Sequence, residues 1–263
     1  MAKPSLKRLE GAITRNLAAL GHTVSGFSSA SGGVLRDNDM YEVYVFTLLL
    51  KAAEEQGLSV GLVNLHPRGG SGLEARFRAS PGDLHAGPGC TFGVVTPLPP
   101  LWKYLARGAP LDLSTYVRMN HPFLRRLWPW LAEVHTGVKV MGHSGVAHEA
   151  DLLVLPTWEA QAARIRKRAP RYWRVHLVGE CKFYADKLGL PLGRAFVGLA
   201  SEIRRGDLVL LTNSARTDSI GALVATRPRL AYIDSLTPTK PAEKMFKQIA
   251  GKVWAKHPPM HHR

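Results

Sequence analysis

The chain has 263 residues, two cysteines and a formal net charge of +15 at pH 7. A hydrophobic content of 45% allows a sizeable buried core, which predicts a globular fold. The longest apolar run, VYVFTLLL from Val43, is too short to cross a bilayer, and the polar start MAKPSLKRLE shows no secretory signal. We therefore expect no membrane partner. The two cysteines are Cys90 and Cys181, and Cys181 lies in an expected buried strand, so we expect no disulfide framework and a cytoplasmic protein.

The excess of positive charge points to a class of partner. A charge of this size repels itself unless a polyanion balances it. Nucleic acid is the usual polyanion, because each phosphate contact by Lys or Arg releases counterions. Association with ribosomes or with an anionic membrane surface is a weaker interpretation. The charge therefore favours nucleic-acid binding and indicates nothing about chemistry.

The N-terminal half combines two helices with short strands. Apolar residues at helical spacing predict a helix over residues 4–20. A second helix is expected from about Asn38, capped by Asn38 or Asp39, with Glu42 in its first turn and Gly57 at its end. The stretch SGFSSASGGVL between them is expected to be a loop. Strands are predicted in SVGLVNL, EARFRAS and TFGVVTPL. Residues 97–128 predict a helical elaboration.

The C-terminal half alternates strands with helices. Strands are predicted over residues 134–142, 148–156, 174–184, 207–213 and 229–236, and helices over residues 192–206 and 241–257. The basic connection 158–173 is expected to be partly helical. With no internal repeat and no shift of composition, the pattern predicts a single α/β domain.

Two charged residues stand out in the strand at residues 174–184. Side chains alternate between the faces of a strand, so Glu180 and Lys182 point to the same side. The opposite side is apolar and is predicted to face the core: Val175, Leu177, Gly179, Cys181 and Phe183. A solvated pair on an exposed face is the alternative, but the flanking residues VHLVG are too apolar for a fully exposed strand.

An acidic residue opens the apolar run of the preceding strand. Asp151 begins DLLVLP, and Glu149 lies on the same face. A buried carboxylate is costly unless it is paired or bound to a metal, although Asp151 could also be a simple strand-start residue. If Asp151 and Glu180 meet, a divalent cation would offset their repulsion, and oxygen ligands suit Mg²⁺ or Mn²⁺.

Asp151 followed by Glu180–Cys181–Lys182 resembles the PD-(D/E)xK nuclease superfamily, which has the restriction-endonuclease-like fold. The resemblance covers residues 39–64 and 138–234, and it departs from many members in having Ala150 instead of proline before the aspartate. It implies an α/β fold with a mixed central sheet flanked by helices, formed here by a single domain over residues 1–263 with an insertion at about residues 65–135.

The resemblance also implies a site and an activity. Asp151, Glu180 and the Cys181 carbonyl would hold Mg²⁺ or Mn²⁺, and Lys182 would serve the attacking water or the transition-state charge. Glu42 would be a helper from the preceding helix, although it could also be a favourable helix-start charge. Glu149 fits a supporting or surface position better than a ligand position. The implied enzyme is a nuclease acting on nucleic acid, with DNA favoured, in restriction, phage defence or repair; a homodimer or a defence-complex partner fits double-strand cutting.

Two rival interpretations assign no catalysis. The chain could be a non-catalytic, basic nucleic-acid-binding subunit that keeps the nuclease fold, although the intact acidic residues and lysine disfavour this. It could also be a basic structural or assembly protein whose D…ExK pattern is accidental. In the second case Asp151 and Glu180 would lie far apart.

Two further sets of residues carry weaker signals. The spacing of His143 and His148, with His135 upstream, fits neither a helical face nor strand alternation, which favours surface or phosphate-contacting roles over a metal cluster. The basic runs Arg164–Arg174 and Arg204–Arg205 are suited to backbone contacts, and the first interleaves aromatic residues that can stack on bases. A solvated loop is the alternative, and no motif supports sequence-specific readout.

Overall fold

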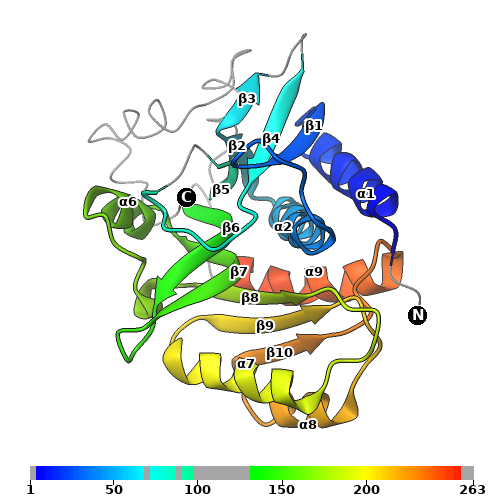
Figure 1. The fold of residues 1–263 in the computed structure, drawn as a ribbon, viewed down its shortest axis with the longest axis vertical. Helices are drawn as coiled ribbons and strands as arrows, with labels where there is room; N and C mark the ends of the chain where they lie inside the picture. The colour runs from blue at the N-terminus through cyan, green and yellow to red at the C-terminus, as the bar shows by residue number, and fades with distance from the viewer. Residues whose placement is uncertain (1–3, 68–71, 87–89, 97–130, 256–263) are drawn as a thin grey trace, which may run out of the picture.

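A seven-stranded mixed sheet forms the centre of the computed structural model, which describes residues 4–67, 72–86, 90–96 and 131–255 (Figure 1). The strand order is β10-β9-β8-β7-β6-β5-β2. Neighbours from β2 to β8 are antiparallel, whereas β8, β9 and β10 are parallel. The bounds are β2 Ser59–Val63, β5 Phe92–Thr96, β6 Ala132–Met141, β7 Ala147–Pro156, β8 Leu177–Lys182, β9 Asp207–Thr212 and β10 Leu230–Ile233. The predicted mixed α/β class is confirmed.

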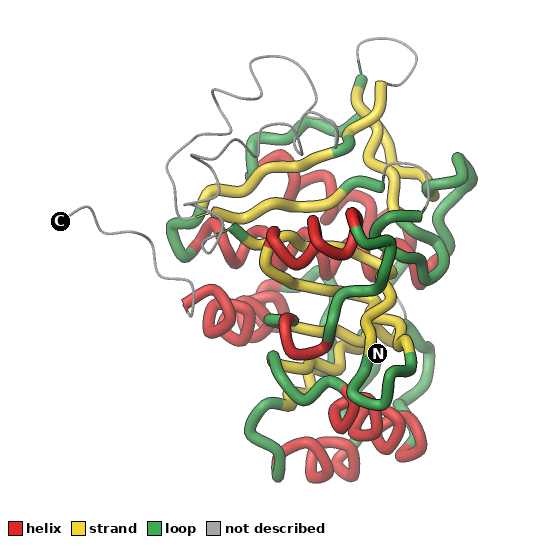
Figure 2. Tube along the Cα trace, turned by 90° about the vertical axis from the view of Figure 1, so that its left-hand side faces the viewer, coloured by secondary structure: helices red, strands yellow, loops and turns green. Residues whose placement is uncertain are grey.

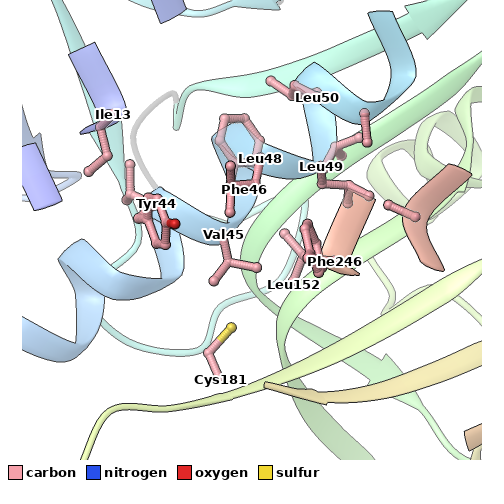
Figure 3. Packing of buried hydrophobic residues seen from close by; sticks show 14 of the residues in the cluster. Ile13, Tyr44, Val45, Phe46, Leu48, Leu49, Leu50, Leu152, Cys181 and Phe246 are labelled. Carbon is pink, nitrogen blue, oxygen red and sulfur yellow. The ribbon is translucent and has the colours of Figure 1, made fainter. Parts of the chain in front are cut away.

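Three helices cover one face of this sheet: α1 (Leu6–Ala19), α2 (Asp37–Glu55) and α9 (Lys240–Ala255). The central helix is α2, in which 13 of 19 residues are buried, as expected of a helix that is apolar on nearly all sides. Figure 3 shows Val45, Leu49 and Phe246 packing together above the sheet near Cys181. The Trp254 indole N–H donates to the Leu49 carbonyl at 3.1 Å, which ties α9 to α2.

The other face is covered by α6 (Thr157–Ile165), α7 (Leu190–Glu202) and α8 (Asp218–Ala225). A second apolar cluster joins these helices to residues of β7, β8 and β9. The tube view in Figure 2 shows helices on both sides of the strands. The short helix α8 is not among the elements expected from the sequence. Among the described residues, no helix is both long and apolar enough to cross a membrane.

A separate three-stranded sheet lies next to β2, in the order β1-β4-β3. Its strands are β1 (Gly26–Ser29), β3 (Leu65–Pro67) and β4 (Leu73–Phe77). The expected loop at SGFSSASGGVL therefore contains a strand, which pairs in parallel with β4. The single strand expected in SVGLVNL is divided between both sheets at Asn64, whose φ is 62°, a turn conformation that asparagine tolerates better than most residues.

The proposed insertion at about residues 65–135 spans parts of both sheets. Its strands β3 and β4 belong to the small sheet, whereas β5 lies within the large one, between β2 and β6. The helical elaboration expected over residues 97–128 lies outside the described residues.

The start of α2 differs from the expectation. Arg36, not Asn38 or Asp39, is the cap residue, and Asp39 is the third helical residue, where its carboxylate accepts the Arg36 N–H at 2.9 Å. The acidic residues of the first turn are Asp37 and Asp39. Glu42 lies in the second turn, beyond the strongest part of the dipole field, so a helix-start role explains it poorly.

A buried charged cluster joins β6 to α6. Glu133 is fully buried and accepts two hydrogen bonds from the Arg164 guanidinium, one of them at 3.0 Å, and its Oε2 lies 2.8 Å from His135 Nε2. His135 is 2% exposed and stacks on Phe92. The expected surface role of His135 is therefore wrong, and Arg164 belongs to this ion pair, not to a solvated basic run. Burial lowers the pKa of His135 to about 4, against the opposing effect of Glu133.

Candidate active site

Regular pairing in the large sheet is interrupted on both sides of Asp151. On one side, the β6–β7 ladder pairs Thr136 with Leu152 and Val138 with Ala150 but skips Gly137, whose φ is 58°, a value that favours glycine. On the other side, the β7–β8 ladder ends at Leu152–Gly179. Asp151 therefore lies where β7 separates from β8, at a one-residue gap in the pairing of β7 with β6, which resumes at Val138–Ala150.

Beyond the last β7–β8 pair, the Asp151 carboxylate, instead of a backbone carbonyl of β7, accepts the next backbone hydrogen bond of β8. Its Oδ2 accepts the Cys181 backbone N–H at 2.7 Å. Because the N–H and C=O of one strand residue point to the same side, the Cys181 carbonyl faces the same opening. The Cys181 side chain points into the first apolar cluster, as predicted, and burial raises the pKa of its thiol well above the usual range. Cys181 thus contributes backbone atoms to this site.

One ammonium group contacts both predicted carboxylates. Lys182 Nζ lies 3.4 Å from Asp151 Oδ2 and 3.0 Å from Glu180 Oε2. All three side chains are largely buried, with 25% of Lys182, 17% of Glu180 and 9% of Asp151 exposed. The accidental-motif interpretation required these acids to be far apart, and they are not. A solvated surface pair is excluded by the same burial.

Helix α2 brings Glu42 to this group of charges. The neighbouring Tyr41 stacks on Phe183, with ring centroids 5.0 Å apart, and its hydroxyl donates to the Leu236 carbonyl at 3.1 Å. Phe183 directly follows Lys182, so this stacking fixes α2 against the end of β8. Burial, followed by the charges of Asp151 and other acids, raises the pKa of Glu42 to about 10.

Burial and the charge of Asp151 raise the pKa of two further acids in the site. Burial and then the charge of Asp151 raise the pKa of Glu180 to about 7 and also raise that of the exposed Glu149. Burial alone would lower the pKa of Lys182, but Asp151 and Glu180 outweigh burial and raise it. The ammonium group is therefore firmly charged and only partly neutralises the acidic residues around it.

A pocket of about 200 Å³ opens beside these charges. Glu149, Glu180 and Lys182 line one side, together with His148. The other side is apolar and comes mainly from α7: Leu192, Ala195, Phe196, Leu199 and Leu210 of β9. Glu149, Glu180 and Lys182 are thus open to a ligand that approaches between the β7–β8 end of the sheet and α7, and Asp151 lies behind Lys182, in contact with its ammonium group.

Two residues that the sequence analysis did not single out support this geometry. Asn213, just after β9, accepts the Tyr184 N–H and donates to the Tyr184 carbonyl, both at 2.9 Å, which fixes the chain beyond Lys182. Gly179 leaves room for the close approach of β7, because a Cβ atom there would meet the Leu152 Cβ at 3.0 Å. The sequence carried a signal for each of them: Asn213 is an amide at the end of an expected buried strand, and Gly179 is a glycine within a strand.

The donor set fits an open divalent site and does not form a closed cage. No group of three or more His, Cys, Asp or Glu side chains in the described ranges is arranged to hold a metal ion. Mg²⁺, however, is usually bound by one or two carboxylates and several waters. Asp151 and Glu180 supply that number, and the Cys181 carbonyl faces the same space. Burial and then the charge of Asp151 raise the pKa of Glu42, Glu149 and Glu180, so a bound cation would favour the ionised form of these acids.

Comparisons with known proteins gave no match, whether with family models, with curated proteins or with solved structures. Any function assigned to this site therefore depends on its geometry and on the D…ExK resemblance.

Replacing Glu42 by glutamine is expected to raise the free energy of unfolding by about 1–3 kcal/mol in EDTA near neutral pH. Between pH 4.5 and about pH 10, the folded protein binds more protons at Glu42 than the unfolded chain does. The free energy of unfolding of the wild type therefore falls as the pH rises through this window. Glutamine has a similar shape and does not titrate. Urea unfolding measures the change, with the exposed Glu55→Gln as control. A less stable Glu42→Gln protein would contradict the crowding of acids described above.

Proposed function

We propose that the protein is a metal-dependent nuclease with a restriction-endonuclease-like core, which hydrolyses phosphodiester bonds in nucleic acid, with DNA as the favoured substrate. The observation that carries the proposal is the contact of one lysine with two carboxylates at the separated ends of β7 and β8. The antiparallel order β6-β7-β8, followed by parallel β9, and the net positive charge are consistent with it.

Each residue of the site has a role in this proposal. Asp151, Glu180 and the Cys181 carbonyl would hold Mg²⁺ or Mn²⁺, which when bound would polarise the phosphate and lower the pKa of a coordinated water. The Cys181 N–H orients the Asp151 carboxylate. The Lys182 ammonium, held at the pocket wall, can orient the attacking water or stabilise the negative charge that grows on the phosphate. Glu42, whose raised pKa keeps it protonated in the metal-free site, would lose its proton when a cation binds and would then support the cation from the side of α2.

The non-catalytic alternative has one observation in its favour. Lys182 already contacts both carboxylates, so the pair could be a purely structural ion pair in a nucleic-acid-binding subunit. A structural pair would need no divalent cation, whereas the nuclease requires one. Metal binding at Asp151 therefore separates the two functions.

Replacing Asp151 by asparagine is expected to abolish Mn²⁺ binding and to lower cleavage at least about 100-fold. Asparagine keeps an oxygen that can accept the Cys181 N–H, so the fold should persist, but it removes the negative charge that attracts the cation. Mn²⁺ binding is measured by calorimetry. Cleavage is measured on plasmid DNA, single-stranded DNA and RNA with Mg²⁺ or Mn²⁺, with EDTA as the metal-free control.

The matched control is Asp186→Asn, which removes one exposed carboxylate just beyond β8. It should leave both metal binding and cleavage unchanged. Equal Mn²⁺ affinity in wild type and Asp151→Asn would remove Asp151 from the metal site. Wild-type protein that binds nucleic acid but no Mn²⁺ would favour the non-catalytic subunit.

A further inference from the structure

A second pocket, of about 360 Å³, is lined by Tyr172, Trp173, Arg204 and Arg205. The aromatic residues belong to the short 3-10 helix η2 (Tyr172–Arg174), and the arginines follow the C-terminal end of α7. The fold therefore brings together two basic runs that are separate in the sequence. The volume lies within the range of small-ligand sites.

The aromatic part of this pocket is ordered by its neighbours. Tyr172 and Trp173 are half-buried, and their rings are nearly perpendicular, at 88°, with centroids 4.8 Å apart. The Arg171 guanidinium lies 5.0 Å from the centre of the Trp173 ring. Aromatic rings beside guanidinium groups are the surfaces on which unpaired bases stack, and such stacking strengthens binding about 5- to 150-fold per base.

The arginines around the pocket are available for phosphate groups. Within the described part of the chain, none of Arg171, Arg174, Arg204 and Arg205 forms an ion pair with an acidic side chain. All four are exposed. Arg204 and Arg205 line the pocket, and Arg171 lies over the Trp173 ring. A nucleotide could stack its base on an aromatic ring of the pocket and place its phosphates against these guanidinium groups, which would use both the aromatic and the basic residues.

Contacts along the β6–β7 hairpin connect this pocket to the candidate active site. His148 lines the active-site pocket, and its Nε2 lies 3.6 Å from Glu202 Oε2 at the end of α7. The His143 backbone N–H donates to the Glu202 carbonyl, and its ring nitrogen lies 3.0 Å from the Tyr172 hydroxyl. Figure 1 shows this hairpin beside the C-terminal end of α7.

We infer that the pocket of Tyr172, Trp173, Arg204 and Arg205 binds an unpaired nucleotide of a single-stranded nucleic acid whose chain continues into the active site. The inference deepens the proposed nuclease and rests on it for the path of the chain. It makes the preferred substrate a single strand or a frayed end, because a base inside a duplex cannot stack on a protein ring.

The test is the affinity of wild type and variants for a fluorescein-labelled single-stranded 20-mer in EDTA, measured by anisotropy with DNA and RNA of one sequence. Trp173→Ala is expected to bind at least about 5-fold more weakly, whereas Trp173→Phe keeps a ring and stays within about 2-fold of wild type. For Arg204→Ala/Arg205→Ala, the slope of log K against the logarithm of the salt concentration is expected to become less steep by about 1.4, because two phosphate contacts are lost. The matched control, Lys7→Ala/Arg15→Ala, removes two exposed charges from the distant α1.

The inference is overturned if the pocket variants bind like the control, or if the wild type binds neither strand at low salt. Because EDTA prevents cleavage, the outcome does not depend on catalysis. Weakened binding in the pocket variants of a protein that never cleaves would support the pocket and reject the nuclease. Unchanged binding in the pocket variants of a protein whose cleavage requires Asp151 would support the nuclease and reject the pocket. A tighter complex with DNA or with RNA identifies the polymer that the pocket serves.

Discussion

Replacing Lys182 by alanine is expected to slow cleavage about 100- to 1,000-fold with little change in the affinity for nucleic acid. The ammonium is the cation that contacts both Asp151 and Glu180, and its raised pKa keeps it charged. Without it, the site lacks the group that orients water or stabilises the transition-state charge. Binding should persist, because Lys182 is a single charge in a chain with 35 lysines and arginines.

The alanine variant also leaves two carboxylates without their ion-pair partner, so a second substitution is needed. Lys182→Arg keeps the charge but presents a planar fork in place of a compact ammonium, and it should retain the fold while still losing most of the activity. Lys187→Ala removes an exposed lysine shortly after β8 and should cleave like the wild type. Rates come from single-turnover cleavage of the substrate that the wild type cuts.

Equal cleavage by wild type and Lys182→Ala would remove Lys182 from the mechanism. Retained activity in Lys182→Arg alone would show that the site needs a positive charge but not an ammonium, which would favour charge stabilisation over proton transfer, because arginine stays protonated.

The charged residues of the site could be predicted because each leaves a local signal. Strand alternation places Glu180 and Lys182 on one face, and an acid at the start of an apolar run singles out Asp151. The hydrogen bond from Cys181 to Asp151 could not be predicted, because it joins residues 30 positions apart and depends on where two strands separate. The sequence shows only a glycine, Gly137, at the corresponding point of β6.

The fold was predictable where the pattern is long and periodic. The helices α1 and α2 and the strands from β6 to β9 follow their apolar patterns closely, whereas β1 is four residues of Gly, Phe and Ser that form a strand only because β4 lies alongside.

The surface role expected for His135 failed because its burial, too, depends on residues far away in the sequence. Its partner Glu133 is local, but the burial of both depends on α6, which brings Arg164 across the sheet.

Replacing Glu133 by leucine is expected to lower the free energy of unfolding by about 3–5 kcal/mol. Glu133 is completely buried, and Arg164 is 10% exposed, so the substitution leaves a guanidinium with little access to water. It also removes the hydrogen-bond partner of His135. The charge of Arg164 and the hydrogen bonds from His135 and Arg164 hold the pKa of Glu133 below its usual range against the effect of burial, which indicates that the carboxylate is ionised in the folded protein.

A double substitution distinguishes an unpaired charge from a packing defect. In Glu133→Leu/Arg164→Met both charges are gone, and methionine can still contact Phe92, over which the guanidinium now lies at 5.0 Å. Most of the lost stability should return, because a buried ion pair contributes little beyond a well-packed apolar pair. Denaturant unfolding followed by circular dichroism measures each variant. Glu55→Ala, which removes an exposed ion pair with Lys247, is the control and should cost no more than about 1 kcal/mol. A double variant as unstable as Glu133→Leu would instead assign the cost to the shape of the site around His135.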